Sequence, residues 1–310
     1  CWITGGLSGT SYASGQRSWL QSPCFDISSL SRPELRFLIY WETEYQYDGG
    51  NLQYSLDCGQ SWRTLGGSNV ASCKAANWFD IGSITNLSGL ANPSCGWSGT
   101  TLPSSGSCRG GNGSGGWVTA RYCLQELQGQ HSVIFRFTFG SGTTCNDYDG
   151  LAVDKIELYD RPSRVTSVTY TCFGPNRFQF IDQQPACVSS RDWDFGDGST
   201  QLNGAVSVIH SYSTGGLYNL TLTSTDACQG TEITTIPVRA LGYTASVHPL
   251  SCLGGTDGGI TLTFPASNNG VTTVSWENPR LSGSTLSGLD TGTYVFTLSA
   301  PQSCTLSDSV

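Results

Sequence analysis

Three observations predict an all-β, disulfide-rich protein of tandem β-sandwiches. Apolar stretches are short and alternate with polar residues at a period of two, as in residues 35–41, 133–139 and 218–223. The 310 residues include 39 Gly, and Ser and Thr are also abundant, a composition that suits short strands joined by tight turns. The 13 cysteines lack the paired spacing of a zinc finger and indicate an oxidising compartment. Helices should be rare and short.

Charge and hydropathy exclude two classes of partner. The net charge is −8, and only Lys74 and Lys155 are lysines, so no basic face is available for nucleic acid. No apolar run approaches the ~20 residues of a membrane helix, and direct membrane insertion is not expected. The sequence has no Met and no signal peptide, so we expect an internal fragment. An odd cysteine count leaves at least one thiol free, bound to another chain, or without its partner.

Two breaks divide the sequence into three predicted domains. The first is Arg161-Pro162-Ser163, and the second lies between Pro237 and Gly242. The predicted domains are residues 1–161, 162–240 and 241–310.

The middle domain has the sharpest motif. Trp193 and Phe195 alternate inward on a strand, Asp197-Gly198 is a hairpin-type turn, and residues 216–222 form a following core strand. We interpret Asp194 and Asp197 as turn residues. This motif resembles the polycystic kidney disease (PKD) domain, which implies a small immunoglobulin-like sandwich that serves as a spacer or adhesion module outside the cell.

The third domain carries Cys252, then Thr256-Asp257-Gly258-Gly259-Ile260, and later residues 286–298 and Cys304. It resembles the repeat of the gliding-motility adhesins of Bacteroidota (SprB-type), in which two cysteines flank a small sandwich. The resemblance implies a Cys252–Cys304 disulfide. We also assign Cys172 and Cys228 of the middle domain to disulfides.

The first domain contains Trp2-Ile3-Thr4-Gly5-Gly6-Leu7, residues 22–28 and 47–62, and Asp147-Tyr148-Asp149-Gly150-Leu151. Together these resemble the MAM-like jelly-roll domains of secreted Bacteroidota proteins, which implies a jelly roll and secretion by a type IX pathway. The usual first strand would lie upstream of Cys1, so an exposed edge beside residues 2–7 could support self-association. A stretch rich in Cys, Gly and Ser, at residues 68–116, is inserted relative to the family.

Oxygen-bearing side chains of the first domain suggest a calcium site. Hard oxygen ligands on adjacent loops are what calcium requires, and the same Asp-Gly pairs also make ordinary turns. The candidate ligands are Asp48, Asn146, Asp147, Asp149 and Asp154.

Three tryptophans of the insertion, Trp78, Trp97 and Trp117, are candidates for stacking on sugar rings. The competing interpretation is that they are core residues, as most tryptophans in strands are. Surface glycans or other cell-surface proteins are the expected partners.

Catalytic signatures are absent from the sequence. His131, His210 and His248 are dispersed, and neither a zinc-protease helix motif nor a nucleophile elbow occurs. The favoured function is a non-catalytic adhesion and spacer region of a secreted cell-surface protein. Two alternatives stay open: an accessory C-terminal region of a secreted metallopeptidase or glycosidase, and a structural filament or surface-layer subunit.

Overall fold

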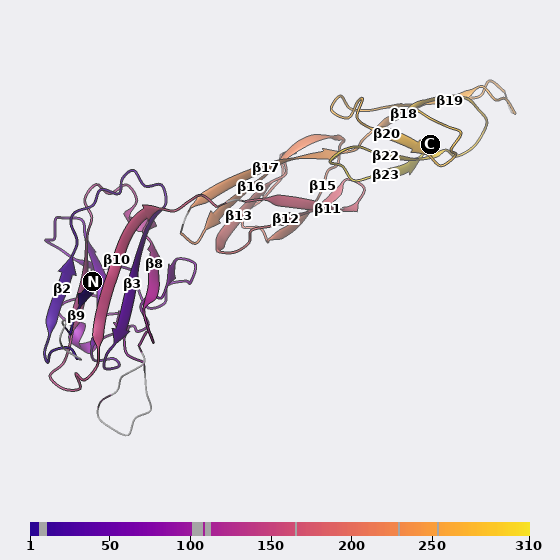
Figure 1. Cartoon of the computed structure of the whole chain (residues 1–310). Coiled ribbons are helices and arrows are strands. Elements are labelled where there is room, and N and C mark those ends of the chain that lie inside the picture. Colours follow the sequence, from indigo (N-terminus) through magenta and orange to yellow (C-terminus); the bar gives the residue numbers. More distant parts are fainter. Residues whose placement is uncertain (6–10, 101–107, 109–112, 165, 229, 253) are drawn as a thin grey trace. The chain divides into compact units, whose positions relative to one another are not determined.

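The computed structural model describes residues 1–5, 11–100, 108, 113–164, 166–228, 230–252 and 254–310 (Figure 1). It confirms the predicted all-β class of tandem β-sandwiches, because the described helices are two 3-10 turns of three residues each. None of the described helices is long and apolar enough to cross a membrane.

The elements of the first part of the chain are β1 (Trp2–Ile3), β2 (Arg17–Gln21), β3 (Pro33–Glu42), β4 (Gly49–Ser55), β5 (Arg63–Thr64), β6 (Ala75–Ala76), η1 (Thr85–Leu87), β7 (Trp97–Ser98), β8 (Val118–Cys123), η2 (Gln125–Leu127), β9 (Ile134–Gly140) and β10 (Gly150–Asp160). The remaining elements are β11 (Val168–Gly174), β12 (Arg177–Asp182), β13 (Val188–Asp194), β14 (Thr200–Gln201), β15 (Ser207–Ser211), β16 (Gly216–Asp226), β17 (Thr231–Ala240), β18 (Thr244–His248), β19 (Gly258–Thr263), β20 (Thr273–Trp276), β21 (Thr285–Leu289), β22 (Val295–Ser299) and β23 (Leu306–Ser309).

The chain forms two compact units. The first comprises Cys1–Pro162 together with Ala227–Gly230, and the second comprises Ser163–Asp226 and Thr231–Val310. The boundary after Pro162 lies two residues beyond the end of β10, within the Arg161-Pro162-Ser163 break. The second predicted domain break, between Pro237 and Gly242, lies inside the second unit.

The first unit is a jelly roll of two facing sheets. One sheet has the strand order β1-β10-β3-β8-β6 and the other β2-β9-β4-β5, with β7 added beside β4. Because β1 pairs with β10 and β2 with β9, the chain wraps as a folded-over hairpin, which is the jelly-roll connectivity. Trp2–Ile3 therefore forms an edge strand of the first sheet, and residues 6 and 7 of the expected strand lie outside the described residues.

Alternation along β3 and β9 builds the core between these sheets. Leu35, Phe37 and Ile39 of β3 point inward and are almost fully buried, whereas the residues between them are partly exposed. On β9, Phe135 and Phe137 meet them from the opposite sheet, and the rings of Phe37 and Phe137 pack edge to face at 4.9 Å. A period of two places such residues on one face of a strand, as the sequence predicts.

The second unit begins with a small sandwich made of the sheets β11-β12-β15 and β14-β13-β16-β17. Trp193 and Phe195 are buried, and β13 and β14 form the expected hairpin. Its turn is held by side chains, since Asp194 Oδ1 accepts the amide of Gly196 at 2.9 Å and Asp197 Oδ1 accepts the amide of Ser199 at 3.0 Å. These contacts confirm the turn roles of both aspartates.

The last sandwich of the second unit pairs the sheets β18-β19-β21 and β20-β22-β23 around Trp276 and Phe296. Hydrogen bonds and a disulfide fasten it to the preceding sandwich. The amide of Arg239 donates to the carbonyl of Gln302 at 3.0 Å, Asn176 hydrogen-bonds both backbone groups of Leu241, and a disulfide joins Cys172 to Cys304. The two sandwiches are therefore parts of one compact unit.

The disulfides correct one prediction. Cys304 is bonded to Cys172, and Cys252 is free and exposed, so the expected Cys252–Cys304 bridge is wrong. Cys172 and Cys228 are in disulfides as predicted, and the partner of Cys228 is Cys123 of β8. The resemblance implied the wrong pairing because Cys304 bonds to a cysteine of the preceding sandwich.

Candidate functional site

Asp48 is the best-defined residue of the predicted calcium set. It precedes β4, and its carboxylate is fully buried. Oδ2 accepts the Tyr12 hydroxyl at 2.8 Å, and Oδ1 accepts the amide of Gly142 at 2.7 Å and the side-chain amide of Asn86 at 2.8 Å. Burial raises the pKa of Asp48, and these three donors oppose the rise. The carboxylate thus connects the segments of Tyr12 and Gly142 and the 3-10 helix η1 to the start of β4.

Asn146 has a side-chain oxygen that lacks a partner. Its Nδ2 donates to the carbonyl of Gly142 at 3.1 Å, whereas the buried Oδ1 makes no hydrogen bond to the described residues. A buried polar oxygen without a partner costs about 1–3 kcal/mol. Asp147, next in the chain, is exposed. An amide oxygen and a neighbouring carboxylate suit a hard cation.

Asp149 and Asp154 lie apart from one another. Asp149 Oδ2 accepts the hydroxyl of Tyr40 at 2.9 Å, at the start of β10. Asp154 lies five residues further along this strand, roughly 16 Å away at the rise of a β-strand, and its carboxylate is 3.6 Å from the amino terminus. Asp154 cannot share an ion with Asp149, so its assignment to this site is wrong.

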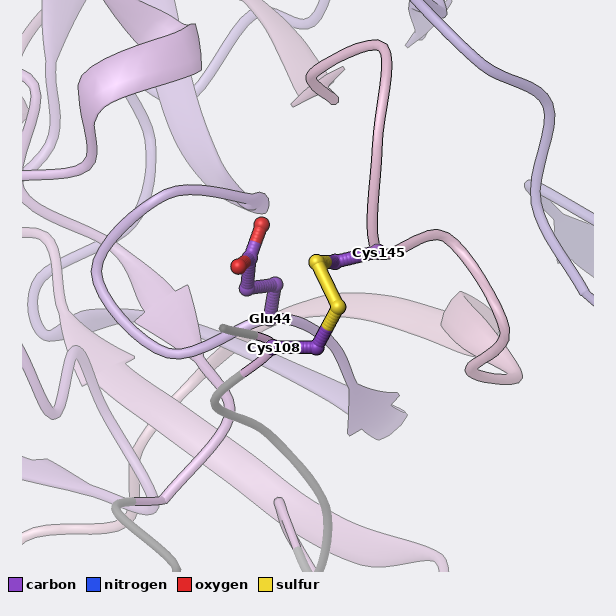
Figure 2. A group of neighbouring side chains, drawn as sticks. All are labelled: Glu44, Cys108 and Cys145. Carbon is purple, nitrogen blue, oxygen red and sulfur yellow. A yellow bond between two sulfur atoms is a disulfide. The ribbon is translucent and has the colours of Figure 1, made fainter. Parts of the chain in front are cut away.

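One cluster of potential metal ligands occurs among the described residues, and its members are Glu44, Cys108 and Cys145. Their candidate ligand atoms lie within 4.8 Å of one another (Figure 2). Cys108 and Cys145 are joined in a disulfide, so neither sulfur is a thiolate that could bind a metal. The cluster is therefore a Cys108–Cys145 disulfide next to the buried side chain of Glu44. None of its members is a predicted calcium ligand.

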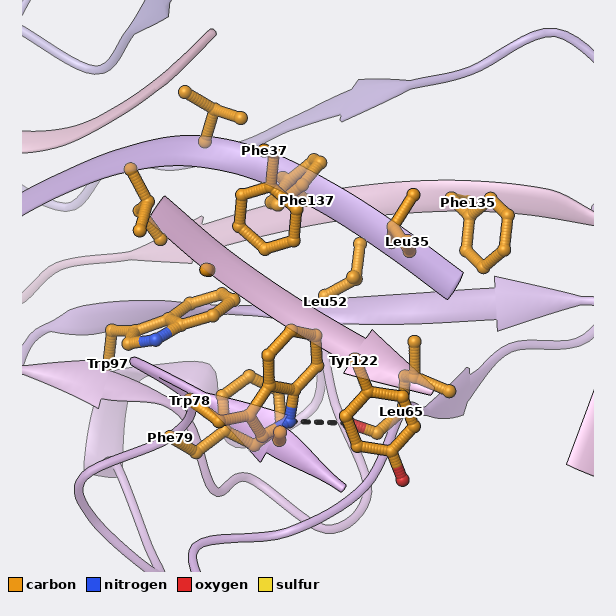
Figure 3. Packing of buried hydrophobic residues seen from close by; sticks show 14 of the residues in the cluster. Leu35, Phe37, Leu52, Leu65, Trp78, Phe79, Trp97, Tyr122, Phe135 and Phe137 are labelled. Carbon is orange, nitrogen blue, oxygen red and sulfur yellow. Dashed lines mark hydrogen bonds between the residues drawn. The ribbon is translucent and has the colours of Figure 1, made fainter. Parts of the chain in front are cut away.

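The tryptophans of the insertion are divided between the core and the surface. Trp78 and Trp97 are 8% and 0% exposed and pack among Phe37, Phe79 and Tyr122 (Figure 3). Their indole nitrogens donate to the carbonyls of Leu65 and Asn77 at 3.2 and 3.1 Å. Neither ring can reach a glycan, so their assignment as ligand-binding residues is wrong.

The insertion folds back into the sandwich, which explains this result. β6 adds to the first sheet beside β8, and β7 adds to β4 in the second sheet. Residues 101–107 and 109–112 of the insertion lie outside the described residues. Trp117 is 51% exposed, and its ring lies 6.3 Å from that of Tyr40. Of the three predicted tryptophans, it alone keeps a surface suitable for a ligand.

A second exposed tryptophan, which was not among the predicted ligand-binding residues, lies on the sheet β2-β9-β4-β5. Trp19 of β2 is 53% exposed, and the guanidinium carbon of Arg136 on β9 lies 5.9 Å from the centre of its ring and 4.0 Å from that of Trp62. Trp19 stands between Arg17 and Gln21 at a period of two, a signal that its side chain shares their solvent-facing side. The contacts of Arg136 with Trp19 and Trp62 join residues far apart in the sequence, so no local sequence pattern predicts them.

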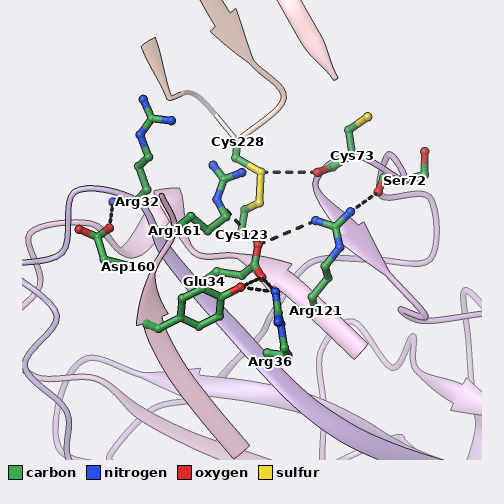
Figure 4. A network of polar contacts seen from close by, with 11 residues as sticks. Arg32, Glu34, Arg36, Ser72, Cys73, Arg121, Cys123, Asp160, Arg161 and Cys228 are labelled. Atoms are coloured by element: carbon green, nitrogen blue, oxygen red, sulfur yellow. Dashed lines mark hydrogen bonds and ion pairs between the residues drawn. A yellow bond between two sulfur atoms is a disulfide. The ribbon is translucent and has the colours of Figure 1, made fainter. Parts of the chain in front are cut away.

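A buried ionic cluster lies at the start of β3 (Figure 4). The Glu34 side chain is 2% exposed and accepts the Tyr159 hydroxyl at 2.7 Å. Its oxygens also lie 3.2 Å from Arg36 and 3.8 Å from both Arg121 and Arg161. The Cys123–Cys228 disulfide is close by. We interpret the cluster as structural.

Two of the three histidines pair with aspartates. His210 stacks on Phe195 with ring centres 4.0 Å apart, and its Nε2 lies 2.7 Å from Asp197 Oδ2. His131 lies 3.3 Å from Asp26 on an exposed surface. The His210 contacts bind the β15 strand to the β13–β14 turn, as expected for a structural residue.

The fold and these sites define a modular, disulfide-linked β-sandwich region. Residues 166–239 match the family model of the PKD domain, so the chain contains a PKD domain. Such a disulfide-rich, all-β region is compatible with an extracellular protein.

Two solved structures are similar to parts or most of the chain. The PKD1 domain of the Vibrio cholerae metalloprotease PrtV is 22% identical and is covered over 93% of its length, against 24% of this chain, at a TM-score of 0.22. The FN1–FN3 domains of chicken CNTN1 are 10% identical, with 97% of that structure and 94% of this chain covered, also at a TM-score of 0.22. No curated protein matches the sequence.

Proposed function

We propose that this chain is a non-catalytic binding and spacer region of a large secreted cell-surface protein. The observation that carries the proposal is the PKD domain, set among other disulfide-linked β-sandwiches. In this proposal the jelly roll contacts surface glycans or other cell-surface proteins, and the second unit serves as a spacer. The MAM-like and SprB-type resemblances, with a type IX-secreting Bacteroidota source, belong to the same proposal.

The second unit suits a spacer for a physical reason. A force applied along unlinked sandwiches would unfold and extend each one in turn. In this unit the Cys172–Cys304 disulfide joins the two sandwiches covalently. The covalent cross-link limits how far the chain between these cysteines can extend. Such a cross-link is stable only in an oxidising compartment, in agreement with an extracellular location.

Binding to intact cells tests the proposal. The fluorescently labelled full chain should bind saturably to intact cells from the habitat of the source organism. Loss of binding after periodate treatment of the cells would indicate a glycan partner, and loss after protease treatment would indicate a protein partner. Binding no greater than that of the reduced and unfolded chain would contradict the proposal.

We further propose that calcium binds beside Asn146 and Asp147. Their side chains fit the ion because the buried Oδ1 of Asn146 has no described hydrogen-bond partner. A ligand that binds only the folded state stabilises it by about 2.7 kcal/mol at a hundredfold excess over Kd. We therefore expect calcium to raise the melting temperature of the full chain, and a chelator to reverse the rise.

Two variants make this experiment specific. Asn146→Ala should abolish the calcium-dependent rise, whereas Asp154→Ala, which changes an exposed carboxylate further along β10, should preserve it. An equal response of both variants to calcium, or no response of the unsubstituted chain, would refute the calcium site.

A further inference from the structure

The outer face of the second jelly-roll sheet is polar where its inner face is aromatic. Phe135 and Phe137 of β9 point into the core, so Arg136 between them points outward. The strand register places a row of polar side chains across this face: Gln21, Arg136, Gln53 and Thr64. The neighbouring row begins with Trp19. The face therefore combines an exposed indole with hydrogen-bonding groups.

Two loops border a groove of about 630 Å³ on this face. One loop supplies Gln60, Ser61 and Trp62, the other supplies residues from Ser88 to Ser94, and Arg136 lines the groove as well. Both walls are anchored: Gln53 donates to the carbonyl of Leu90 at 2.9 Å, and the Trp62 indole donates to the carbonyl of Gly59 at 3.1 Å. A volume within ~300–1,000 Å³ is usual for small-ligand sites.

Arg136 supplies positive charge without a carboxylate to neutralise it. Its Nε donates to Gln53 Oε1 at 2.6 Å and its Nη2 to the carbonyl of Leu90 at 3.4 Å, and both acceptors are neutral. Among the described residues no carboxylate forms an ion pair with it. The guanidinium is partly buried, which strengthens its attraction for an anion. A planar carboxylate can accept two parallel hydrogen bonds from a guanidinium.

The remaining lining is neutral and rich in hydroxyl and amide groups, from Gln60, Ser61, Ser88, Asn92 and Ser94. Such groups hydrogen-bond sugar hydroxyls. Trp62 lines the groove, and the exposed ring of Trp19 lies outside the lining but beside Arg136, 5.9 Å from its guanidinium carbon. Flat rings in these positions suit the apolar faces of sugar rings. We propose that this groove binds a saccharide that carries a carboxylate, with Arg136 as the anion contact. The inference rests on the proposed binding function and assigns it a site and a ligand class.

Calorimetry on the full chain tests this site with matched ligands. Digalacturonic acid and galactobiose differ only in their carboxyl groups, and sialyllactose tests a second source of carboxylate. We expect at least one acidic saccharide to bind roughly tenfold more tightly than its neutral counterpart. Trp19→Ala and Arg136→Gln should each weaken binding by a similar factor. Trp117→Ala is the control, because Trp117 is equally exposed on the other sheet.

Three results would overturn the saccharide site. They are equal binding of the acidic and neutral disaccharides, loss of binding in Trp117→Ala with retention in Trp19→Ala, and no binding of any acidic saccharide by a chain that still binds cells. The last result would leave the proposed binding function intact and refute only this site. Trp19 is exposed, so its variant should fold even where Arg136→Gln does not.

A second and independent observation concerns two exposed thiols of the first unit. Cys24 and Cys58 are both free in the structure, and their sulfurs contact the same hydroxyl, Ser132 Oγ, at 3.1 and 3.9 Å. Cys58 follows β4 in the loop that leads to Trp62. We infer that the two thiols form a disulfide in the oxidised protein. Each thiol loses a proton, and glutathione disulfide takes up the two electrons and two protons as it becomes two glutathione molecules.

Thiol mapping of the folded chain, refolded in glutathione buffer and alkylated without reduction, tests this inference. We expect a linked peptide pair that contains Cys24 and Cys58, whereas the exposed Cys252 should be alkylated. Alkylation of both Cys24 and Cys58 in the folded, oxidised chain would overturn the inference. Linkage of either cysteine to a different residue would also overturn it.

Discussion

Replacement of Cys172 and Cys304 by Ser is expected to lower the free energy of unfolding of the second unit by about 5 kcal/mol. The two cysteines are 132 residues apart in the sequence. In the chain-entropy model, a cross-link between such distant residues strongly restricts the unfolded chain. The effect should be large because the disulfide joins two small sandwiches whose individual cores are limited.

Denaturant unfolding of the full chain measures this effect. Cys252→Ser is the matched control, because Cys252 is free and exposed in the same unit. It should leave the unfolding midpoint unchanged. A loss of stability in Cys252→Ser as large as that in the double variant, with little change in Cys172→Ser alone, would support a Cys252–Cys304 pairing and contradict the Cys172–Cys304 disulfide.

Glu34→Ala is expected to destabilise the first unit by about 3 kcal/mol. The substitution removes a buried carboxylate that accepts the Tyr159 hydroxyl and compensates nearby guanidinium groups. The partly buried Tyr159 hydroxyl and the arginines would then lose the Glu34 carboxylate as an acceptor. The partial exposure of the arginines limits the expected loss.

Thermal unfolding followed by tryptophan fluorescence measures this loss. Asp26→Ala is a suitable control, because Asp26 is an exposed carboxylate of the same unit, paired with an exposed histidine. It should change the melting temperature little. Similar melting temperatures for the two variants would show that the Glu34 cluster does not stabilise the jelly roll.

The strands and the PKD domain could be predicted from sequence because their signals are local. Alternation over residues 35–41 and 133–139 depends only on neighbouring positions, and so does the Trp193 to Ser199 motif. The functional assignments failed where they depended on contacts between distant segments. Trp78 and Trp97 are in the core because the insertion adds strands to both sheets, and no periodic pattern indicates that.

The candidate sites illustrate the same limit. Asp149 and Asp154 are close in sequence but are separated by the length of an extended strand. Trp19, Trp62 and Arg136 come from three segments and meet only through the strand order β2-β9-β4-β5. Sequence reasoning could have identified Trp19 as exposed from its alternation with Arg17 and Gln21. The contact between Arg136 and Trp19 depends on the pairing of β2 with β9, which the sequence does not indicate.

The most direct test of the central claim, binding without catalysis, is recovery of the ligand after binding. The full chain would be incubated with isolated surface material under oxidising conditions, and the retained ligand would be eluted and compared by mass spectrometry with the input. We predict saturable retention and ligand of unchanged mass. Cleavage products that accumulate with time and depend on the chain would contradict the claim and would favour an enzyme.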